Sequence, residues 1–292
     1  MKLSVSSYSF QSAIHVGAIT QFDTVAKAKE LGINAIEFID LAPVYGQKPT
    51  LEEQKDMAKR LREEAERLGM IINAYTIGAN LFCEGDAAKA EIERLAGQLD
   101  VAKLLGASVM RHDVCYKTGT EGISRSFDMM LPTMAKNIRA VADYGRELGI
   151  RTCTENHGYI AQDSDRVERL FNTVCHDNYG ILVDIGNFAC ADEDSAIAVS
   201  RLAPYAVHVH AKDFIKHPFS EHFSGGFSTR GCNRLEGCAI GEGHIPVAQC
   251  LAILERAGYN GYVTVEYEGG KNCFEGIATG RDALLALGVT AD

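Results

Sequence analysis

Four residues with metal-binding or acid–base side chains stand at matching places in short β-rich segments: Glu155, Asp184, His210 and Glu266. Asp184, for example, lies between the apolar residues Val183 and Ile185. Neighbouring residues of a β-strand point to opposite faces, so the apolar row and the polar residue face different sides. In a parallel barrel the apolar row would pack under helices and the polar row would point inward. We therefore expect the four side chains to converge at the mouth formed by the carboxyl ends of the strands.

Three carboxylates buried together are costly unless a positive group holds them. A divalent cation would do so, and three carboxylates with one imidazole suit Mn²⁺, Mg²⁺ or Co²⁺ and can hold Zn²⁺. The pattern therefore predicts one metal ion bound by the four residues. The alternative is a set of barrel salt bridges, in which the same acids pair with Lys212, Arg111 or Arg151.

Two further polar residues share these inward faces. His157 follows Glu155 by two residues, and Lys212 follows His210 by two, so each should reach the same mouth. We predict that His157 is an acid/base or a substrate contact and that Lys212 binds a ketone, enolate or phosphate oxygen. Alternatively, His157 is a hydrogen-bonded rim histidine and Lys212 pairs with a carboxylate such as Asp184.

An earlier strand adds one acidic residue to this predicted interior. Glu37 ends its strand facing inward, between the outward residues Ile36 and Phe38. It could anchor sugar hydroxyls, hold a catalytic histidine in place, or form a core ion pair. His208 lies one layer deeper than His210, and we expect it to be a hydrogen-bonded interior histidine.

Glycines end the predicted helices at a regular spacing. Gly32 to Gly69 and Gly69 to Gly106 are both 37 residues, about one βα unit. A glycine just past a helix can adopt the left-handed backbone conformation cheaply. Between these helices lie eight predicted strands, at 3–10, 34–40, 70–78, 107–114, 150–158, 179–188, 206–214 and 261–269. Eight strands alternating with helices predict an α/β fold, a (β/α)8 TIM barrel, with residues 1–292 as a single domain.

The longest segment without a periodic pattern, residues 215–244, follows the seventh predicted strand and contains six glycines. Long loops in compact domains are usually lids, binding loops or contact arms. Its position puts it on the face where barrels have their active sites. We expect an irregular loop there, serving either the site or a surface or subunit contact.

Composition excludes several classes of protein. The 292 residues include 29 Lys and Arg against 39 Asp and Glu, a formal charge of −10, which argues against nucleic acid or an anionic membrane as a partner. No apolar run reaches the ~18 residues of a membrane helix, and the N-terminus does not resemble a signal peptide. Nine cysteines without a CxxC pair favour reduced thiols and a cytoplasmic location.

The motifs around the four residues are TENHG at Glu155, VDIGN at Asp184, HVHAKD at His210 and TVEYEG at Glu266. With these motifs the whole chain resembles the xylose-isomerase-like TIM-barrel superfamily, the sugar phosphate isomerase/epimerase group that also contains endonuclease IV. The resemblance to its ketose 3-epimerases implies that the matching Glu, Asp, His and Glu bind one metal ion, commonly Mn²⁺. It also implies that Glu155 and Glu266 act as acid and base.

The predicted function is therefore that of a divalent-metal-dependent sugar isomerase or epimerase, which removes a proton next to the carbonyl of a keto-sugar or polyol. Chelation of a hydroxyl and the carbonyl would stabilise the charge that develops, and Glu155 and Glu266 could flank the substrate. The alternative is a lyase acting by β-elimination on a keto-polyol or 3-oxo-glycoside. Asn187 stands where the 3-epimerases carry a histidine, and the pattern at 208–213 is closer to the inosose dehydratase branch.

Two alternatives belong to other classes. An endonuclease IV-like DNA repair enzyme would need three zinc ions and a basic surface, which the charge of −10 disfavours. A non-catalytic, sugar-binding subunit of a complex would not need an intact set of four ligands. We expect a small sugar or polyol as the partner, with no nucleic acid or membrane. A homo-oligomer is expected, and a partner subunit is possible.

Overall fold

A closed barrel of parallel strands forms the centre of the computed structural model, which describes residues 1–44, 46–116 and 126–291. Around the barrel the strands follow the order β1-β11-β7-β6-β5-β4-β3-β2. Their bounds are β1 (Lys2–Ser6), β2 (Ala35–Ile39), β3 (Ile71–Ile77), β4 (Val109–His112), β5 (Arg151–Glu155), β6 (Tyr179–Asp184), β7 (Ala206–Ala211) and β11 (Tyr262–Val265). The fold is the single-domain (β/α)8 TIM barrel that the sequence predicts.

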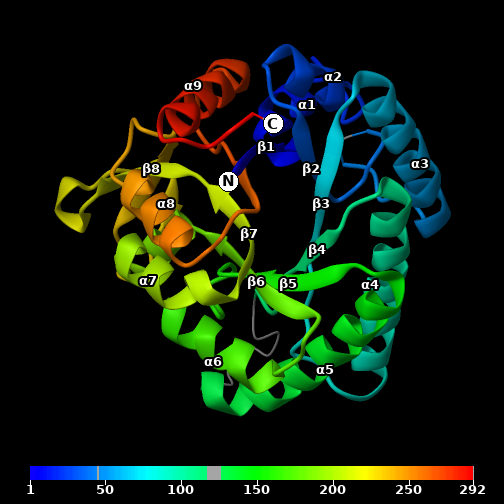
Figure 1. Cartoon of the computed structure of the whole chain (residues 1–292). Helices are drawn as coiled ribbons and strands as arrows, with labels where there is room; N and C mark the ends of the chain where they lie inside the picture. Colours follow the sequence, from blue (N-terminus) through cyan, green and yellow to red (C-terminus); the bar gives the residue numbers. More distant parts are fainter. Residues whose placement is uncertain (45, 117–125, 292) are drawn as a thin grey trace.

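Helices surround these strands (Figure 1). They are α1 (Gln11–His15), α2 (Asp23–Glu30), α3 (Leu51–Leu68), α4 (Gly85–Leu105), α5 (Phe127–Leu148), α6 (Ser164–Val174), α7 (Ser195–Leu202), α8 (Val247–Arg256) and α9 (Cys273–Ala286). Helix α3 shows how the sequence sets its limits. Thr50 and Glu53 form a reciprocal capping box at its start, and Gly69 ends it with a left-handed φ of 64°. Between the two ends of the helix, Leu61 and Ala65 are buried.

The alternating pattern of the strands holds in the barrel. Ile181, Val183 and Val209 belong to the core of buried apolar residues. The register of β6 and β7 places Asp184 beside His210. The polar row that the sequence predicts to face inward is therefore aligned across neighbouring strands.

Several strands end earlier than predicted. Residues 7–10 form the 3₁₀ helix η1 (Ser7–Phe10) instead of extending β1, because the Ser6 side chain accepts a hydrogen bond from the Tyr8 N–H. His157 lies beyond β5, in an isolated bridge with Ala161. Glu266 follows the last residue of β11, although its N–H still donates to the Ala211 carbonyl at 3.0 Å.

The prediction of an irregular loop at 215–244 is wrong. This part of the chain contributes β8 (Asp213–His217), β9 (Phe227–Ser228) and β10 (Arg234–Cys238), which form a three-stranded antiparallel sheet in the order β8-β10-β9. Arg234 fixes the turn by donating to the carbonyls of Gly225 and Gly226 at 2.8 and 2.7 Å. Strand β9 has only two residues, and glycines interrupt the chain between the three strands, so no alternation marked them in the sequence. The remaining 3₁₀ helices are η2 (Asn187–Ala191), η3 (Ala203–Tyr205) and η4 (Phe219–Glu221).

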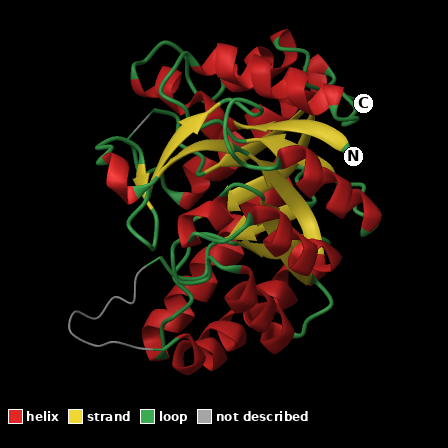
Figure 2. Ribbon diagram, turned by 90° about the vertical axis from the view of Figure 1, so that its left-hand side faces the viewer, coloured by secondary structure: helices red, strands yellow, loops and turns green. Residues whose placement is uncertain are grey.

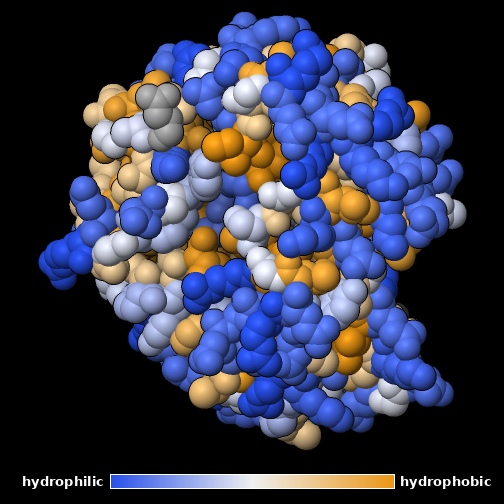
Figure 3. Space-filling model, turned by 45° about the vertical axis from the view of Figure 1, so that its right-hand side comes forward, coloured by the Kyte–Doolittle hydropathy of each residue, from blue (hydrophilic) through white to orange (hydrophobic). Residues whose placement is uncertain are grey.

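The two termini meet at one end of the barrel (Figure 2), where Lys2 and Thr290 form an isolated parallel bridge. The face shown in Figure 3 is mostly hydrophilic, with hydrophobic residues in small groups. Among the described helices, none combines the length and apolar character that a membrane span requires.

Candidate metal centre

The barrel brings together the four residues predicted to bind a metal. One ligand atom from each of Glu155, Asp184, His210 and Glu266 lies within 4.8 Å of the others, and all four residues are buried. The Nδ1 atom of His210 is at the centre, 3.5 Å from Glu266 Oε2, 3.8 Å from Asp184 Oδ2 and 3.9 Å from Glu155 Oε1. This geometry is a possible carboxylate–histidine metal site.

The orientation of His210 fits a cation. Its Nε2 atom lies 2.9 Å from a carboxylate oxygen of Glu37, so this nitrogen carries the proton. Its Nδ1 atom has no hydrogen-bond partner among the residues that the structure describes. Burial alone would lower the pKa of His210, but the charges of Glu37 and Glu266 raise it well above its ordinary value. The surroundings of Nδ1 therefore favour a positive charge at that point, which a proton or a metal ion can supply.

Glu37 holds both inward histidines of β7. Its Oε2 atom is 2.7 Å from His208 Nε2 and 2.9 Å from His210 Nε2. Burial raises the pKa of Glu37, but His210 and His208 outweigh it and lower that pKa to about 2. The sequence left three interpretations of Glu37 open. The structure places Glu37 against the two histidines, which agrees with the interpretation that it holds a histidine in place. His208 is the hydrogen-bonded interior histidine that we expected, with Thr264 Oγ1 at 3.2 Å.

Glu155 is fixed on both of its oxygens. Oε2 pairs with the buried Arg111 guanidinium at 2.5 Å, and Oε1 accepts a hydrogen bond from Asn187 Nδ2 at 2.8 Å. Arg111 also lies 2.8 Å from Asp113 Oδ1. One of the salt bridges considered from the sequence is therefore present, whereas Arg151 is exposed and takes no part.

Asp184 presents one oxygen to the backbone and the other to the site. Oδ1 accepts hydrogen bonds from the N–H groups of Gly186 and Asn187 at 2.8 and 2.9 Å. Oδ2 lies 3.0 Å from Lys212 Nζ, which also contacts Glu266. Burial, opposed by the Lys212 charge, raises the pKa of Asp184 to about 7. Lys212 thus pairs with two of the four predicted ligands, as the salt-bridge alternative proposed.

Even with these ion pairs, the carboxylates at the centre outnumber the permanently charged cations. The carboxylates around the centre are those of Glu37, Asp113, Glu155, Asp184, Glu266 and Glu268, and the permanent cations are those of Arg111 and Lys212. Buried negative charge of this kind is stabilised only if it is neutralised. A divalent ion near His210 Nδ1 would do so, and the oxygen-rich donor set fits Mn²⁺, Mg²⁺, Co²⁺ or Zn²⁺.

His157 forms a dyad that the sequence did not reveal. Its Nδ1 atom is 2.8 Å from Asp113 Oδ1, and its side chain remains 39% exposed. Burial alone would lower the pKa of His157, but the hydrogen bond and charge of Asp113 raise it. Asp113 lies within the strand predicted at 107–114, but alternation along that strand could not show that it meets His157. The signal for its inward direction was present, since Asp113 is two residues after Arg111 and has the same parity.

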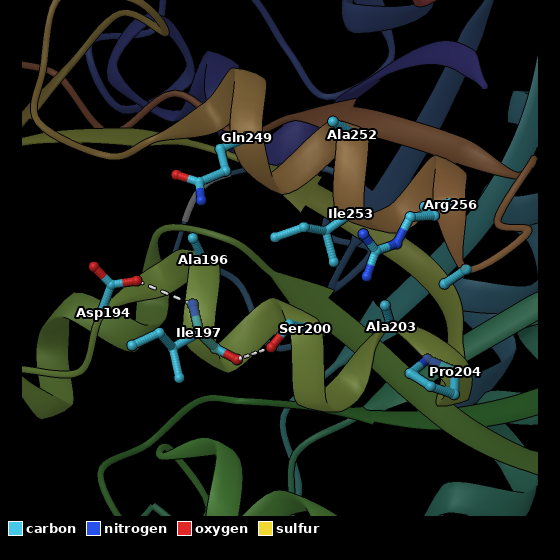
Figure 4. Close-up of a pocket in the computed structure, with 11 residues that line it drawn as sticks. Asp194, Ala196, Ile197, Ser200, Ala203, Pro204, Gln249, Ala252, Ile253 and Arg256 are labelled. Atoms are coloured by element: carbon cyan, nitrogen blue, oxygen red, sulfur yellow. Dashed lines mark hydrogen bonds between the residues drawn. The ribbon is translucent and has the colours of Figure 1, made fainter.

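A small polar cavity of about 250 Å³ connects these groups. Tyr8, Asp40 and His157 line it together with Lys212 and Glu266. A larger cavity, about 780 Å³, lies outside the barrel between α7 and α8 (Figure 4). It contains none of the acid or histidine residues of the centre, so we place the chemistry in the smaller one.

Comparison with known proteins identifies the family. Residues 25–287 match the family model described as xylose isomerase-like TIM barrel, and the chain belongs to this family. The uncharacterized protein MJ1311 of Methanocaldococcus jannaschii is 23% identical over 146 residues. That match covers 49% of this chain and 44% of the archaeal protein, so the chain spans less than half of that relative.

Solved structures share the fold. The IOLI protein with a bound zinc atom is 16% identical, with a TM-score of 0.75 and 98% of each chain covered. The probable 3-DHS dehydratase AsbF of Bacillus anthracis is 17% identical, with a TM-score of 0.74 and 98% and 99% covered. An L-ribulose 3-epimerase is 16% identical, with a TM-score of 0.71 and 98% and 94% covered. At these identities the similarity establishes the architecture alone.

Proposed function

We propose that this protein is a divalent-metal-dependent sugar isomerase or epimerase that removes and returns a proton next to the carbonyl of a keto-sugar or polyol. The observation that carries the proposal is the group of three buried carboxylates around His210 Nδ1. Membership of the xylose isomerase-like family and the fold shared with an L-ribulose 3-epimerase support it. We favour Mn²⁺ because most of the donor atoms are carboxylate oxygens.

A bound divalent ion would supply Lewis-acid stabilisation for the negative charge that develops on the substrate oxygens as the proton leaves. The protein would supply the groups that move the proton. Glu155 comes from β5 and Glu266 follows β11, and two strands of the barrel separate them. They can therefore reach a substrate from two sides, one accepting the proton and the other returning it.

The partners of these carboxylates would keep them in place during the reaction. Arg111 and Asn187 hold Glu155, and Lys212 contacts Glu266. Lys212 Nζ also lies 3.0 Å from Asp184 Oδ2, so its ammonium group is positioned to bind a developing oxyanion at the same point. The small, polar volume of the cavity suits a hydroxyl-rich substrate.

A β-elimination, as in a dehydratase or other lyase, is the second candidate. It requires a base for the carbon-bound proton and an acid for the departing oxygen. The dyad of His157 and Asp113 provides an imidazole at the rim that could act as this acid. Asn187, where a 3-epimerase-like pattern would have a histidine, donates to Glu155 and fixes it as a ligand. The fold shared with the probable dehydratase AsbF agrees with this candidate.

Solvent exchange distinguishes the two candidates. The Mn²⁺-loaded protein would be incubated in D₂O with L-ribulose, D-fructose and 2-keto-myo-inositol, and each mixture followed by NMR. We expect deuterium at the carbon next to the carbonyl of the recovered sugar, and Glu266→Gln should abolish this exchange. An unsaturated product would instead support the lyase. No exchange and no elimination with any keto-sugar would contradict both.

A further inference from the structure

A second cavity adjoins the catalytic one at the carboxyl ends of β1 and β2. Its volume is about 180 Å³, and it shares two lining residues with the catalytic cavity, Ile39 and Asp40. Its other walls include Gln11 and Ile14 of α1, and Gln21. Gln11, Ile14 and Gln21 play no part in the metal centre.

Asp40 stands at the boundary between the two cavities in a strained conformation. Its φ is +36°, in the left-handed region that residues other than glycine rarely adopt. Gln21 fixes the backbone on either side, since its Nε2 donates to the Ile39 carbonyl at 2.7 Å and its Oε1 accepts from the Ala42 N–H at 3.0 Å. The Asp40 N–H itself donates to the Thr76 carbonyl at 3.2 Å. Residues in such strained backbone conformations, fixed by the contacts around them, occur preferentially at functional sites.

The walls of this side cavity combine polar and apolar groups. Asp40 is an exposed residue whose carboxylate accepts a hydrogen bond from the Gly78 N–H, and the Gln11 amide makes no side-chain hydrogen bond with any residue that the structure describes. Ile14 and Ile39 are half-buried and contribute apolar surface. Hydrogen-bonding groups facing an apolar wall suit a ring that carries hydroxyl groups.

Size supports the same conclusion. At about 250 Å³ the catalytic cavity is below the ~300–1,000 Å³ that ligand sites commonly offer, and the two adjoining cavities together reach this range. We infer that the side cavity is a binding subsite for a second, hydroxylated ring attached to the reacting sugar. The physiological substrate is therefore a two-ring compound. This inference rests on the proposed function, because it places the reacting ring at the metal centre.

The test measures binding and does not require turnover. Dissociation constants of the Mn²⁺-loaded protein would be determined by ligand-observed NMR for D-glucose, cellobiose and phenyl β-D-glucopyranoside. We expect at least one two-ring probe to bind about tenfold more tightly than glucose. Comparison of cellobiose with the phenyl glucoside shows whether the side cavity prefers a second sugar ring or an aromatic ring.

Two variants locate the effect. Ile14→Ala removes apolar surface that lines the side cavity but not the catalytic one, and Gln11→Ala removes the amide without filling the cavity. Each should reduce the preference for the two-ring probe to about threefold or less, with glucose affinity and metal content unchanged. Gln249→Ala, a helical glutamine lining the outer cavity of Figure 4, is the matched control and should preserve the preference.

The inference is overturned if no two-ring probe binds more tightly than glucose, or if the preference survives in both variants. Deuterium exchange into a keto-sugar would still be expected in that case, so the proposed function would stand. Loss of that exchange in the parent protein would instead contradict the proposed function itself.

Discussion

At the scale of single residues, Glu37 shows how a side chain outside the four predicted ligands can orient one of them. It is fully buried and holds His210 by Nε2, so that Nδ1 faces the three carboxylates. Carboxylates that orient a metal-binding histidine commonly change metal affinity by 10- to 100-fold when altered. The position of Glu37 on β2, far from β7 in the sequence, explains why the sequence left its role open.

Glu37→Gln should therefore lower the affinity for Mn²⁺ by about 10- to 100-fold, because the neutral amide orients and polarises His210 less well. Isothermal titration calorimetry of the apoprotein with Mn²⁺ measures this change. Glu93→Gln, an exposed position on α4, controls for the altered net charge. An unchanged affinity in Glu37→Gln would show that Glu37 does not support the ligand.

The dyad of His157 and Asp113 gives a second prediction at this scale. For the lyase candidate, Asp113→Asn should reduce the rate at which NMR detects the unsaturated product by about 100-fold or more, since an oriented acid contributes this much. Asn can still accept a hydrogen bond from Arg111, so metal content should not change. His157→Gln and the double variant should show the same defect as Asp113→Asn. Losses that multiply in the double variant would mean that the two residues act independently.

At the scale of the elements, glycines set the repeat of the barrel. Gly69 ends α3 with a φ of +64°, and a Cβ at this position would meet no atom within 4 Å. Any effect of adding a side chain there must therefore come from the backbone and not from a clash. The left-handed conformation costs other residues about 1–2 kcal/mol.

Gly69→Ala should thus lower the free energy of unfolding by about 1 kcal/mol, with metal content unchanged. Chemical denaturation followed by circular dichroism would measure it. Gly270→Ala is the matched control, because its Cβ also meets nothing within 4 Å and its φ is not left-handed. Equal stability of the two variants would refute the role assigned to the helix-ending glycines.

The elements also show what the sequence can and cannot reveal. The alternation on β6 and the glycines that end the helices are local patterns that predicted the barrel, and the alternation also predicted the convergence of its acids. The ends of the strands and the partners of the acids depend on contacts between distant segments. Three examples are contacts of this long-range type. Arg111 pairs with Glu155, Gln21 fixes the backbone beside Asp40, and strands β8, β9 and β10 form a separate sheet. Alternation along a strand shows which face of the sheet a side chain occupies, but it does not show which residue that side chain contacts.

At the scale of the whole molecule, we propose that the barrel binds one divalent ion at the carboxyl ends of its strands. An ion that binds the folded state alone stabilises it by about 2.7 kcal/mol at a concentration 100 times its dissociation constant. Saturating Mn²⁺ should therefore raise the melting temperature of the parent protein and leave that of His210→Ala nearly unchanged. Differential scanning calorimetry makes this comparison, and an equal shift in both proteins would indicate binding elsewhere.

The most direct test is the metal content of the purified protein, measured by elemental analysis after incubation with Mn²⁺, Mg²⁺, Co²⁺ and Zn²⁺ and removal of free ions. The arrangement of Glu155, Asp184, His210 and Glu266 predicts one ion per chain, and its loss in Asp184→Ala. Three zinc ions per chain would favour an endonuclease-like centre. A protein that retains no ion would contradict the claim, because the four side chains would then be a salt-bridge network with Arg111 and Lys212.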